Sequence, residues 1–392
     1  MTIQLSDRVK RVKPSPTLAL SALAQQMKAE GKDVINLGVG EPDFGTPDHI
    51  KAAGIAAINE NKTGYTAVDG IPELKTAIIN KFKRDNDLTY EANQILVSCG
   101  GKQSFYNLCQ AMINAGDEVI IPAPYWVSYP DMVLLAGGKP VIVSAGQDQH
   151  FKLTSADLEN AITEKTRLLV LNSPSNPTGV SYSFEELKAL AQVLAKYPNI
   201  VIATDDMYEH ILFDDQKFVN ILNAAPDLYD RCIVLNGVSK AYAMTGWRIG
   251  YAAGPAELIN GMKKIQGQST SNPTSISQHA SVAALNDSQE CIKPMLIAFK
   301  ERHDFVVKAL NDIDGVECLP SDGTFYSFPN IEGLIARVDG VSTDSELSEL
   351  LLSKKEVAMV PGSAFGAPGH IRISYATSME NLVKAVERLA SL

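Results

Sequence analysis

Lys240 lies where an amine that attacks a carbonyl carbon is expected. It follows the apolar run 231–236 and a Gly-Val-Ser turn, so it stands at the end of an expected buried strand. A lysine that is partly desolvated loses its proton more readily and becomes a nucleophile. Arg248 follows in the same segment, and a guanidinium can bind a phosphate through two hydrogen bonds. Because most lysines are exposed and inert, a surface loop with two solvated cations is the alternative.

Acidic and phenolic side chains follow a second apolar run, at 199–206. This run ends in Asp205 and Asp206, and Tyr208 comes shortly after them. A buried carboxylate could hold a protonated ring nitrogen, and a nearby phenol could hydrogen-bond a ring oxygen. A helix N-cap or a solvated acidic loop would use the same residue types. A metal site is a further alternative, although His210 is the only soft ligand in this stretch and no HExxH spacing is present.

Two further turns follow expected strands. The turn SCGGKQS at 98–104 offers backbone N–H groups at the start of an expected helix, which favours an anion. It is not a Walker P-loop, because the pattern GxxxxGK[ST] is absent. Asn176 lies in the turn NSPSNPTG at 172–179, where proline fixes the backbone and the amide can be held in place. A plain turn is the alternative at that position.

The elements that would position these residues alternate along the chain between about residues 94 and 254. Short, nearly continuous apolar runs predict strands that are buried on both faces of a mainly parallel sheet. Between two of them, 184–195 has one apolar helix face after a capping box of Ser183 and Glu186. Ligands of such α/β layers sit at the carboxyl ends of the strands, so the residues after each run are expected to meet. The expected strands are 94–98, 116–122, 139–144, 166–172, 199–206 and 231–236, and a helix is also expected at 102–115.

The C-terminal part predicts a smaller α+β unit. A long helical region at 288–311 gives way to shorter elements, and the Gly/Pro-rich segment 38–47 is expected to join an N-terminal arm to the large domain. The shorter elements are expected strands at 316–320, 324–328 and 369–376, and expected helices at 345–354 and about 382–389.

Composition limits the class of function. The 392 residues exceed the length at which single cores stop growing, so two domains are expected. A net charge of −10, from 35 Lys and Arg against 45 Asp and Glu, disfavours nucleic acid or a membrane surface as partner. No secretory signal and no bilayer-spanning apolar run is seen, so a cytoplasmic location is expected. Neither a disulfide framework nor a thiolate zinc site is expected, because no CxxC pair occurs among Cys99, Cys109, Cys232, Cys291 and Cys318.

The segment around Lys240 resembles the pyridoxal-phosphate attachment pattern of class I aminotransferases. The match is at Gly237, Ser239, Lys240, Gly246, Arg248 and Gly250. From about Val12 to the C-terminus, the order of further pieces is similar to that of the fold type I aspartate aminotransferases. These pieces are GEPDF (40–44), TGYTAVDG (63–70), SCGGKQ (98–103), PAPYWVSYP (122–130), NSPSNPTG (172–179), DDMY (205–208), PGSAFG (361–366) and RISYA (372–376).

This resemblance implies a fold and a division of the chain. The fold is α/β, the three-layer PLP-transferase fold, with a mainly parallel sheet in a large domain and a smaller α+β domain. Residues 1–45 would form an N-terminal arm and part of the small domain, 46–290 the large cofactor-binding domain, and 291–392 the small C-terminal domain.

The resemblance also implies a role for each matching residue. Lys240 would form the Schiff base with the cofactor aldehyde and carry a proton between the substrate Cα and the cofactor. Asp205 would pair with the ring nitrogen, Tyr208 and Asn176 would hydrogen-bond the ring hydroxyl, and Trp126 would stack on the ring. The phosphate would be surrounded by Gly100, Gly101, Lys102, Ser239 and Arg248, and by Tyr65 from the neighbouring subunit of a homodimer.

For the substrate, the resemblance implies that Arg372 clamps the α-carboxylate through two hydrogen bonds, beside Asn176, Trp126 and the Gly40 backbone. Its expected place in the small domain would couple domain closure to binding.

The distal carboxylate of an acidic substrate needs another cation. The segment 266–278 lacks the arginine that animal-type enzymes use. The bacterial relatives resembled here use the equivalents of Lys102 and Thr17 instead, and both residues are present. This favours aspartate or glutamate, with 2-oxoglutarate or oxaloacetate. The same pair is associated with prephenate as an additional amino acceptor. A solvated lysine at a helix N-terminus is the alternative for Lys102.

The expected function is therefore that of an aspartate aminotransferase, which moves the amino group of L-aspartate to 2-oxoglutarate by a ping-pong mechanism. A glutamate/aspartate–prephenate or aromatic amino-acid aminotransferase is the first alternative. A PLP-dependent Cβ lyase or a decarboxylase would keep Lys240 and Arg372 as well. The aminotransferase-like module of a transcription regulator would need an added DNA-binding segment, and a metal-dependent hydrolase would depend on the acidic loop 205–215 alone.

Overall fold

A seven-stranded sheet forms the larger part of the fold in the computed structural model, which describes residues 3–14 and 16–392. The strand order is β2-β8-β7-β6-β5-β3-β4, and within this described sheet β8 alone is antiparallel to both neighbours. The mainly parallel sheet predicted from the sequence is therefore confirmed. Its strands are β2 (Ile95–Ser98), β3 (Glu118–Ala123), β4 (Lys139–Ser144), β5 (Thr166–Asn172), β6 (Val201–Asp205), β7 (Cys232–Gly237) and β8 (Gly250–Ala253).

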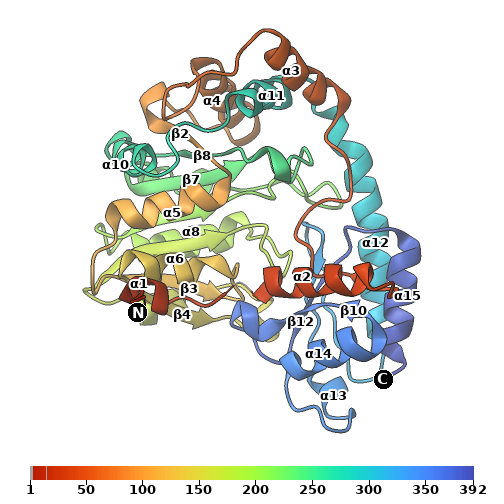
Figure 1. Cartoon of the computed structure of the whole chain (residues 1–392). Helices are drawn as coiled ribbons and strands as arrows, with labels where there is room; N and C mark the ends of the chain where they lie inside the picture. Colours follow the sequence, from red (N-terminus) through yellow and green to blue (C-terminus); the bar gives the residue numbers. More distant parts are fainter. Residues whose placement is uncertain (1–2, 15) are drawn as a thin grey trace.

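Helices cover both faces of this sheet, so the larger part of the molecule has three layers (Figure 1). Successive side chains of a strand point to opposite faces, and accordingly Ile95 and Val97 join one apolar cluster while Leu96 joins another. The helices that bury their apolar faces with Leu96 are α5 (Gly101–Met112), α6 (Ser128–Ala136) and α10 (Ala256–Gly267). Those on the other face are α4 (Pro72–Asn86), α8 (Phe184–Leu194) and α11 (Ser275–Asn286).

Helix α8 begins where its sequence predicts. The backbone N–H of Glu186 donates to Ser183 Oγ at 3.3 Å, and the backbone N–H of Ser183 donates to Glu186 Oε2 at 2.7 Å. These two bonds satisfy donors that the first turn of a helix otherwise leaves without partners. The capping box thus fixes the start of the helix that connects β5 to β6.

The carboxyl ends of the central parallel strands meet at one edge of the sheet. Asn172 at the end of β5 is in register with Asp205 at the end of β6. Strand β7 lies on the other side of β6, and its last residue is Gly237. The turns that carry Asn176, Asp205 and Lys240 therefore leave the sheet next to one another, as the sequence predicts.

Of two small sheets, one contains segments from both ends of the chain, and the other is hydrogen-bonded to the N-terminal segment. Strand β1 (Ile35–Asn36) pairs in parallel with β10 (Val357–Ala358), and the backbone N–H of Ser374 donates to Leu37 O at 2.8 Å. Strand β12 (Ile371–Ser374) lies between β11 (Val360–Pro361) and β9 (Tyr326–Ser327) and is antiparallel to both. An N-terminal segment thus completes the C-terminal unit. The division at residues 45 and 290 stays a prediction.

The longest helix of the described chain is α12 (Lys293–Asn311), which runs from the region of α3 and α11 down to the C-terminal helices (Figure 1). It packs on α15 and β9 through buried residues such as Phe299 and Leu310. In the described part of the chain, no helix has both the length and the apolar character needed to cross a membrane. The remaining α-helices are α1 (Asp7–Lys10), α2 (Pro16–Ala29), α3 (Asp48–Asn59), α7 (Ser155–Ala161), α9 (Ile221–Ala224), α13 (Glu332–Ile335), α14 (Asp344–Lys355) and α15 (Met379–Ala390).

The strand predicted at 316–320 is wrong. Glu317 makes only an isolated antiparallel bridge with Asn330. The side chain of Asn311 instead hydrogen-bonds both backbone groups of Cys318. It accepts from the Cys318 N–H at 2.9 Å and donates to the Cys318 C=O at 2.9 Å. A backbone whose donor and acceptor are taken by a side chain cannot extend a ladder.

Other predicted strands of this part exist but are short. The region 324–328 contributes only β9, because Pro329 has no N–H to continue the ladder. The region 369–376 contributes β12. Strand β8 is not among the predicted strands, since its sequence GYAA consists mostly of residues with weak strand preference.

Candidate active site

A cleft of about 530 Å³ opens at the carboxyl edge of the seven-stranded sheet. Its walls come from the turns after β2, β3, β5, β6 and β7, from α2, from the segment after β1, and from β9 and β12. Every site residue predicted from the sequence lines this cleft except Gly100 and Tyr65. The predicted residues that line it are Thr17, Gly40, Gly101, Lys102, Trp126, Asn176, Asp205, Tyr208, Ser239, Lys240, Arg248 and Arg372.

The amine of Lys240 is held at the centre of this cleft. Its Nζ donates to Gly40 O at 2.5 Å and lies 5.9 Å from the centre of the Tyr208 ring. Burial, and after it the positive charge of Arg372, lowers the pKa of Lys240 to about 8, although Glu41 and Asp205 oppose the shift. A larger fraction of this amine than of an exposed lysine is therefore uncharged near neutral pH, and a nucleophilic or proton-accepting lysine requires the uncharged form.

Asp205 is held by a phenol that the sequence did not single out. Tyr129 OH donates to Asp205 Oδ2 at 2.5 Å, and the backbone N–H of Met207 donates to the other carboxylate oxygen at 3.3 Å. Burial raises the pKa of Asp205, while both hydrogen bonds and the charge of Lys240 favour the ionised form. The hydrogen bonds thus orient the carboxylate at the cleft. The surrounding protein sets its pKa.

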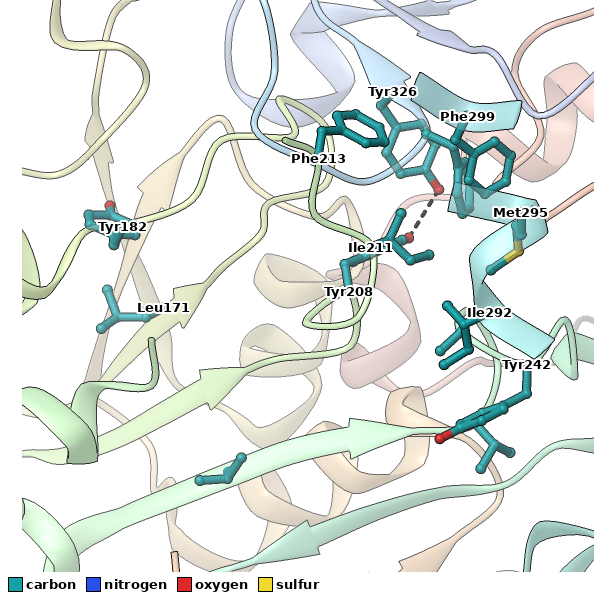
Figure 2. Packing of buried hydrophobic residues seen from close by; sticks show 14 of the residues in the cluster. Leu171, Tyr182, Tyr208, Ile211, Phe213, Tyr242, Ile292, Met295, Phe299 and Tyr326 are labelled. Carbon is teal, nitrogen blue, oxygen red and sulfur yellow. Dashed lines mark hydrogen bonds between the residues drawn. The ribbon is translucent and has the colours of Figure 1, made fainter. Parts of the chain in front are cut away.

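Tyr208 links the loop after β6 of the large sheet to one of the small sheets. Its hydroxyl lies 3.1 Å from the hydroxyl of Tyr326, which is in β9 of a small sheet (Figure 2). Both rings are buried and meet edge to face at 5.9 Å between centres. The two hydroxyl groups therefore connect the loop after β6 to the small sheet that carries Arg372.

An anion cradle lies where β2 meets α5. Gly100 has φ of +84°, and a Cβ placed on it would come within 2.3 Å of Arg248 Nη2. Arg248 donates to Cys99 O at 3.1 Å and to Thr245 O at 3.0 Å, and it forms no ion pair with a carboxylate in the described chain. The first helical turn and a guanidinium without a counter-ion make this corner suitable for a phosphate.

Arg372 is a second cation without a counter-ion. It is 3 % exposed, and among the described residues no carboxylate lies in ion-pair range. Its Nη1 donates to Asn176 Oδ1 at 2.9 Å and its Nη2 to Gly38 O at 2.7 Å, while its buried Nε has no hydrogen-bond partner in the described protein. A buried charge of this kind is stabilised by an incoming anion, and a planar carboxylate matches its geometry.

Lys102 and Trp126 lie together on another wall. Lys102 Nζ is 5.1 Å from the centre of the Trp126 ring, which supports a cation–π contact. Desolvation, and secondly the charge of Arg248, lowers the pKa of Lys102. Thr17, at the start of α2, lines the same cleft. Thr17, Lys102 and Trp126, which the resemblance assigns to the substrate and the cofactor ring, therefore line the same cleft.

Tyr65 is the predicted residue that the chain does not bring to its own cleft. Its side chain is 94 % exposed, in the segment between α3 and α4. Gly100 lies behind the cleft surface, where it makes room for Arg248. Among the residues that sequence reasoning missed, Tyr129 could have been found because it lies one helical turn beyond Trp126 in PAPYWVSYP. Asn172, which donates to Asp205 O at 2.8 Å, and Tyr326 had no comparable signal.

Two buried carboxyl groups of the acidic loop, Asp206 and Glu209, are hydrogen-bonded or paired with protein groups. Asp206 accepts from Thr204 and Asn220 at 2.5 Å each, and Glu209 forms an ion pair with Lys81. Among the residues that the structure describes, no three His, Cys, Asp or Glu side chains are grouped so as to hold a metal ion.

Comparison with known proteins decides the family. Residues 32–389 match the family described as aminotransferase class I and II. The chain belongs to this family. An aspartate/prephenate aminotransferase from Nitrosomonas europaea is 59 % identical over 395 residues, covering 100 % of both chains. Another aspartate/prephenate aminotransferase, from Cereibacter sphaeroides, is 54 % identical over 98 % of this chain and 97 % of its own length.

Solved aminotransferases have the same fold. The crystal structure of the aspartate aminotransferase from Rhizobium meliloti has a TM-score of 0.96 at 48 % identity, covering 100 % of this chain and 98 % of that one. The aspartate aminotransferase from Thermus thermophilus with maleate has a TM-score of 0.94 at 39 % identity, covering 100 % of each chain. The three-layer α/β fold expected from the resemblance is confirmed.

Class I aminotransferases use pyridoxal 5′-phosphate, and the cleft fits this cofactor. The partly neutral Lys240 amine suits an aldehyde, and the glycine cradle with Arg248 suits a phosphate. The Asp205 carboxylate and the Tyr208 hydroxyl suit a ring nitrogen and a ring oxygen. The chain is thus a pyridoxal-phosphate-dependent aminotransferase, whose substrates are amino acids and 2-oxo acids.

Proposed function

We propose that the protein is an aspartate aminotransferase, which exchanges the amino group of L-aspartate with 2-oxoglutarate and gives oxaloacetate and L-glutamate. The observation that carries this proposal is the pair of cations, Arg372 and Lys102, which share one cleft with Lys240 and have no ion-pair partner in the described chain. Two cations on one cavity match the two carboxylates of a dicarboxylic amino acid.

Relatives support a dicarboxylic substrate and widen the choice of acceptor. The Thermus thermophilus enzyme was determined with maleate, a dicarboxylate, and relatives with 54–59 % identity are named aspartate/prephenate aminotransferases. Prephenate is therefore the second candidate amino acceptor. The test is a panel of amino donors against 2-oxoglutarate and against prephenate. The proposal requires that aspartate be the preferred donor with one of them, and preference for a monocarboxylic donor with both would contradict it.

Each residue of the cleft has a role in this proposal. When bound, the cofactor supplies an electron sink for negative charge that develops at the substrate Cα. Asp205 would hold the ring nitrogen protonated, while Asn176 and Tyr208 would hydrogen-bond the ring hydroxyl and Trp126 would stack on the ring. Arg372 orients the α-carboxylate beside Asn176 and Gly40, and Lys102 with Thr17 binds the distal carboxylate. The phosphate is surrounded by Gly100, Gly101, Lys102, Ser239 and Arg248.

Lys240 moves the proton in this proposal. With the cofactor bound, Lys240 would be its attachment point, and the amine of Lys240, when free, would accept the proton of the substrate Cα and return it. A pKa of about 8 suits this exchange, because an amine that titrates near the working pH can both accept and donate. The bond to Gly40 O at 2.5 Å holds the amine against the backbone that this proposal places beside the substrate α-carboxylate.

Lys102→Ala tests the assignment of the distal carboxylate. Loss of the ammonium group removes a charged hydrogen bond worth about 1.5–3 kcal/mol, so we expect kcat/KM for aspartate to fall by about 10- to 100-fold. Phenylalanine lacks the distal carboxylate, so its kcat/KM should change much less. The kcat/KM of the same variant for aspartate and for phenylalanine separates a role at the distal carboxylate from a role at the phosphate. Equal losses would assign Lys102 to the phosphate alone.

Tyr129→Phe tests the support of Asp205. The phenol favours the ionised carboxylate, so its removal raises the pKa of Asp205 further. We expect kcat to fall by about tenfold, since one charge-assisted hydrogen bond is lost while the ring packing stays. The pH titration of the cofactor absorbance should shift as well. Unchanged kcat and absorbance would show that Asp205 does not need this hydrogen bond.

We also propose a homodimer in which Tyr65 of a second copy completes the phosphate site. The 94 % exposure of Tyr65, and the exposed Ile55 and Ile58 on α3 nearby in the chain, support an apolar contact surface there. A cytoplasmic location belongs to the same proposal, and five cysteines without disulfides agree with a reducing compartment.

A further inference from the structure

A buried ion pair lies behind the Asp205–Tyr208 loop and takes no part in the roles above. Lys81, from α4, is 0 % exposed, and its Nζ forms an ion pair with Glu209, whose side chain is 3 % exposed. Glu209 directly follows Tyr208 in the chain. Two charges so far from water are costly unless other groups complete their hydrogen bonds, so their partners indicate what the pair holds together.

The partners of Glu209 come from two segments outside its own loop. Lys81 Nζ donates to Asn86 Oδ1 at 2.8 Å, and Asn86 Nδ2 donates to Glu209 Oε2 at 2.7 Å, both from α4. Asn236 Nδ2, at the end of β7, donates to Glu209 Oε1 at 2.7 Å. One carboxylate therefore joins α4, the loop of Asp205 and Tyr208, and the strand that leads to Lys240.

The contact with Asn236 reaches the lysine segment directly. The other end of the same amide, Asn236 Oδ1, accepts from the backbone N–H of Gly237 at 2.7 Å. Gly237 begins the turn Gly237-Val-Ser-Lys240. A shift of Glu209 would therefore move the loop of Asp205 and Tyr208 relative to the turn that carries Lys240.

The charges in this cluster also interact with one another. Burial favours neutral Glu209, but the charges of Lys81 and His210, with the hydrogen bonds from Asn86 and Lys81, together hold the pKa of Glu209 below its usual value. Burial, and secondly the negative charge of Glu209, raises the pKa of the neighbouring Asp206 to about 8. Lys81 thus forms an ion pair with the ionised carboxylate of Glu209, while the neighbouring Asp206 is mostly protonated at neutral pH.

We propose that Lys81 and Glu209 are positioning residues, which fix Asp205 and Tyr208 relative to Lys240 without touching substrate or cofactor. This inference rests on the proposed roles of those three residues. If it holds, loss of the pair changes how the cofactor is held and how its absorbance titrates, and not only how stable the fold is.

Three variants of the holoenzyme test the proposal. Lys81→Met removes the lysine counter-charge of the buried Glu209 and leaves only His210, whose Nδ1 lies 3.7 Å from Glu209 Oε1. Lys81→Met/Glu209→Gln removes both charges, and this change is often close to neutral for stability, so the double variant should fold even if the single variant does not. The matched control is Lys75→Met. Lys75 lies on the same helix and pairs at 2.8 Å with Asp69, but neither residue contacts the loop or the lysine turn in the described contacts.

The readouts are the dissociation constant of pyridoxal 5′-phosphate and the pH midpoint of its bound absorbance, with thermal unfolding measured beside them. For the double variant we expect the dissociation constant to rise by about tenfold or more, and the midpoint to move by about 0.5 or more. Lys75→Met should leave both at the wild-type values. A folded double variant with the wild-type dissociation constant and midpoint would overturn the proposal and leave the pair a purely structural role. A wild-type protein that binds no cofactor would instead contradict the proposed function.

Discussion

Lys240→Ala is expected to abolish transamination and the absorbance that the cofactor acquires when it is joined to the protein. In the proposed function, removal of the amine takes away both the attachment point and the group that moves the proton. The turnover of aspartate with 2-oxoglutarate should fall by about 10⁴-fold, the upper range for a positioned acid–base group. The measurement is an absorbance spectrum of the purified variant together with a coupled assay for oxaloacetate.

The control for this variant is an exposed lysine. Lys308→Ala removes a side chain that is 80 % exposed and pairs only with Asp312 among its described ion-pair partners. It should retain the spectrum and the turnover of the wild type. A Lys240→Ala protein with an unchanged spectrum would show that another residue carries the cofactor.

Arg372→Lys is expected to have the second largest effect, although the charge is kept. The guanidinium donates to Asn176 Oδ1 and Gly38 O and has one buried N–H without a described partner. A lysine ammonium cannot reproduce the planar fork that binds a carboxylate through two bonds. We expect kcat/KM for aspartate to fall by about 10²-fold, which corresponds to a loss of about 2.7 kcal/mol in the transition state.

The dissociation constant of maleate provides a readout of Arg372 that is independent of turnover. It should rise by a similar factor in Arg372→Lys, because in the proposed function the same cations would bind the two carboxylates of maleate. The control is Arg231→Lys, in which an arginine that donates to the backbone carbonyls of Leu194, Tyr197 and Ile200 is changed away from the cleft. Arg231→Lys should lower stability and leave maleate binding unchanged. Wild-type maleate binding by Arg372→Lys would exclude the clamp.

Local patterns were sufficient to predict the central sheet and the edge that carries the site. Strands buried on both faces have long apolar runs, so β5, β6 and β7 were visible as runs that end before Asn176, Asp205 and Lys240. The sequence predicts that these strand ends share one edge of the sheet, but it does not give the order or the register of the strands. The register of Asn172 beside Asp205 is a property of the folded sheet.

The contacts that the sequence did not predict are those between distant segments. Tyr326 reaches Tyr208 only because β9 joins β12 in a small sheet, and Lys81 reaches Glu209 only because α4 packs behind the loop. The strand expected at 316–320 does not form for a related reason. The side chain of Asn311, from the preceding helix, hydrogen-bonds the backbone N–H and C=O of Cys318. Residue type predicts what a group can do, while tertiary packing decides which partner it has.

The most direct test of the proposed function is the half-reaction with aspartate alone. The holoenzyme is mixed with excess L-aspartate in the absence of any 2-oxo acid, and the oxaloacetate formed per protein chain is measured. A ping-pong aminotransferase should release about one oxaloacetate per chain and then stop, and addition of 2-oxoglutarate should restart it with formation of glutamate. Continued product formation without an acceptor would indicate a lyase or a decarboxylase, and no oxaloacetate at all would contradict the assignment of aspartate as substrate.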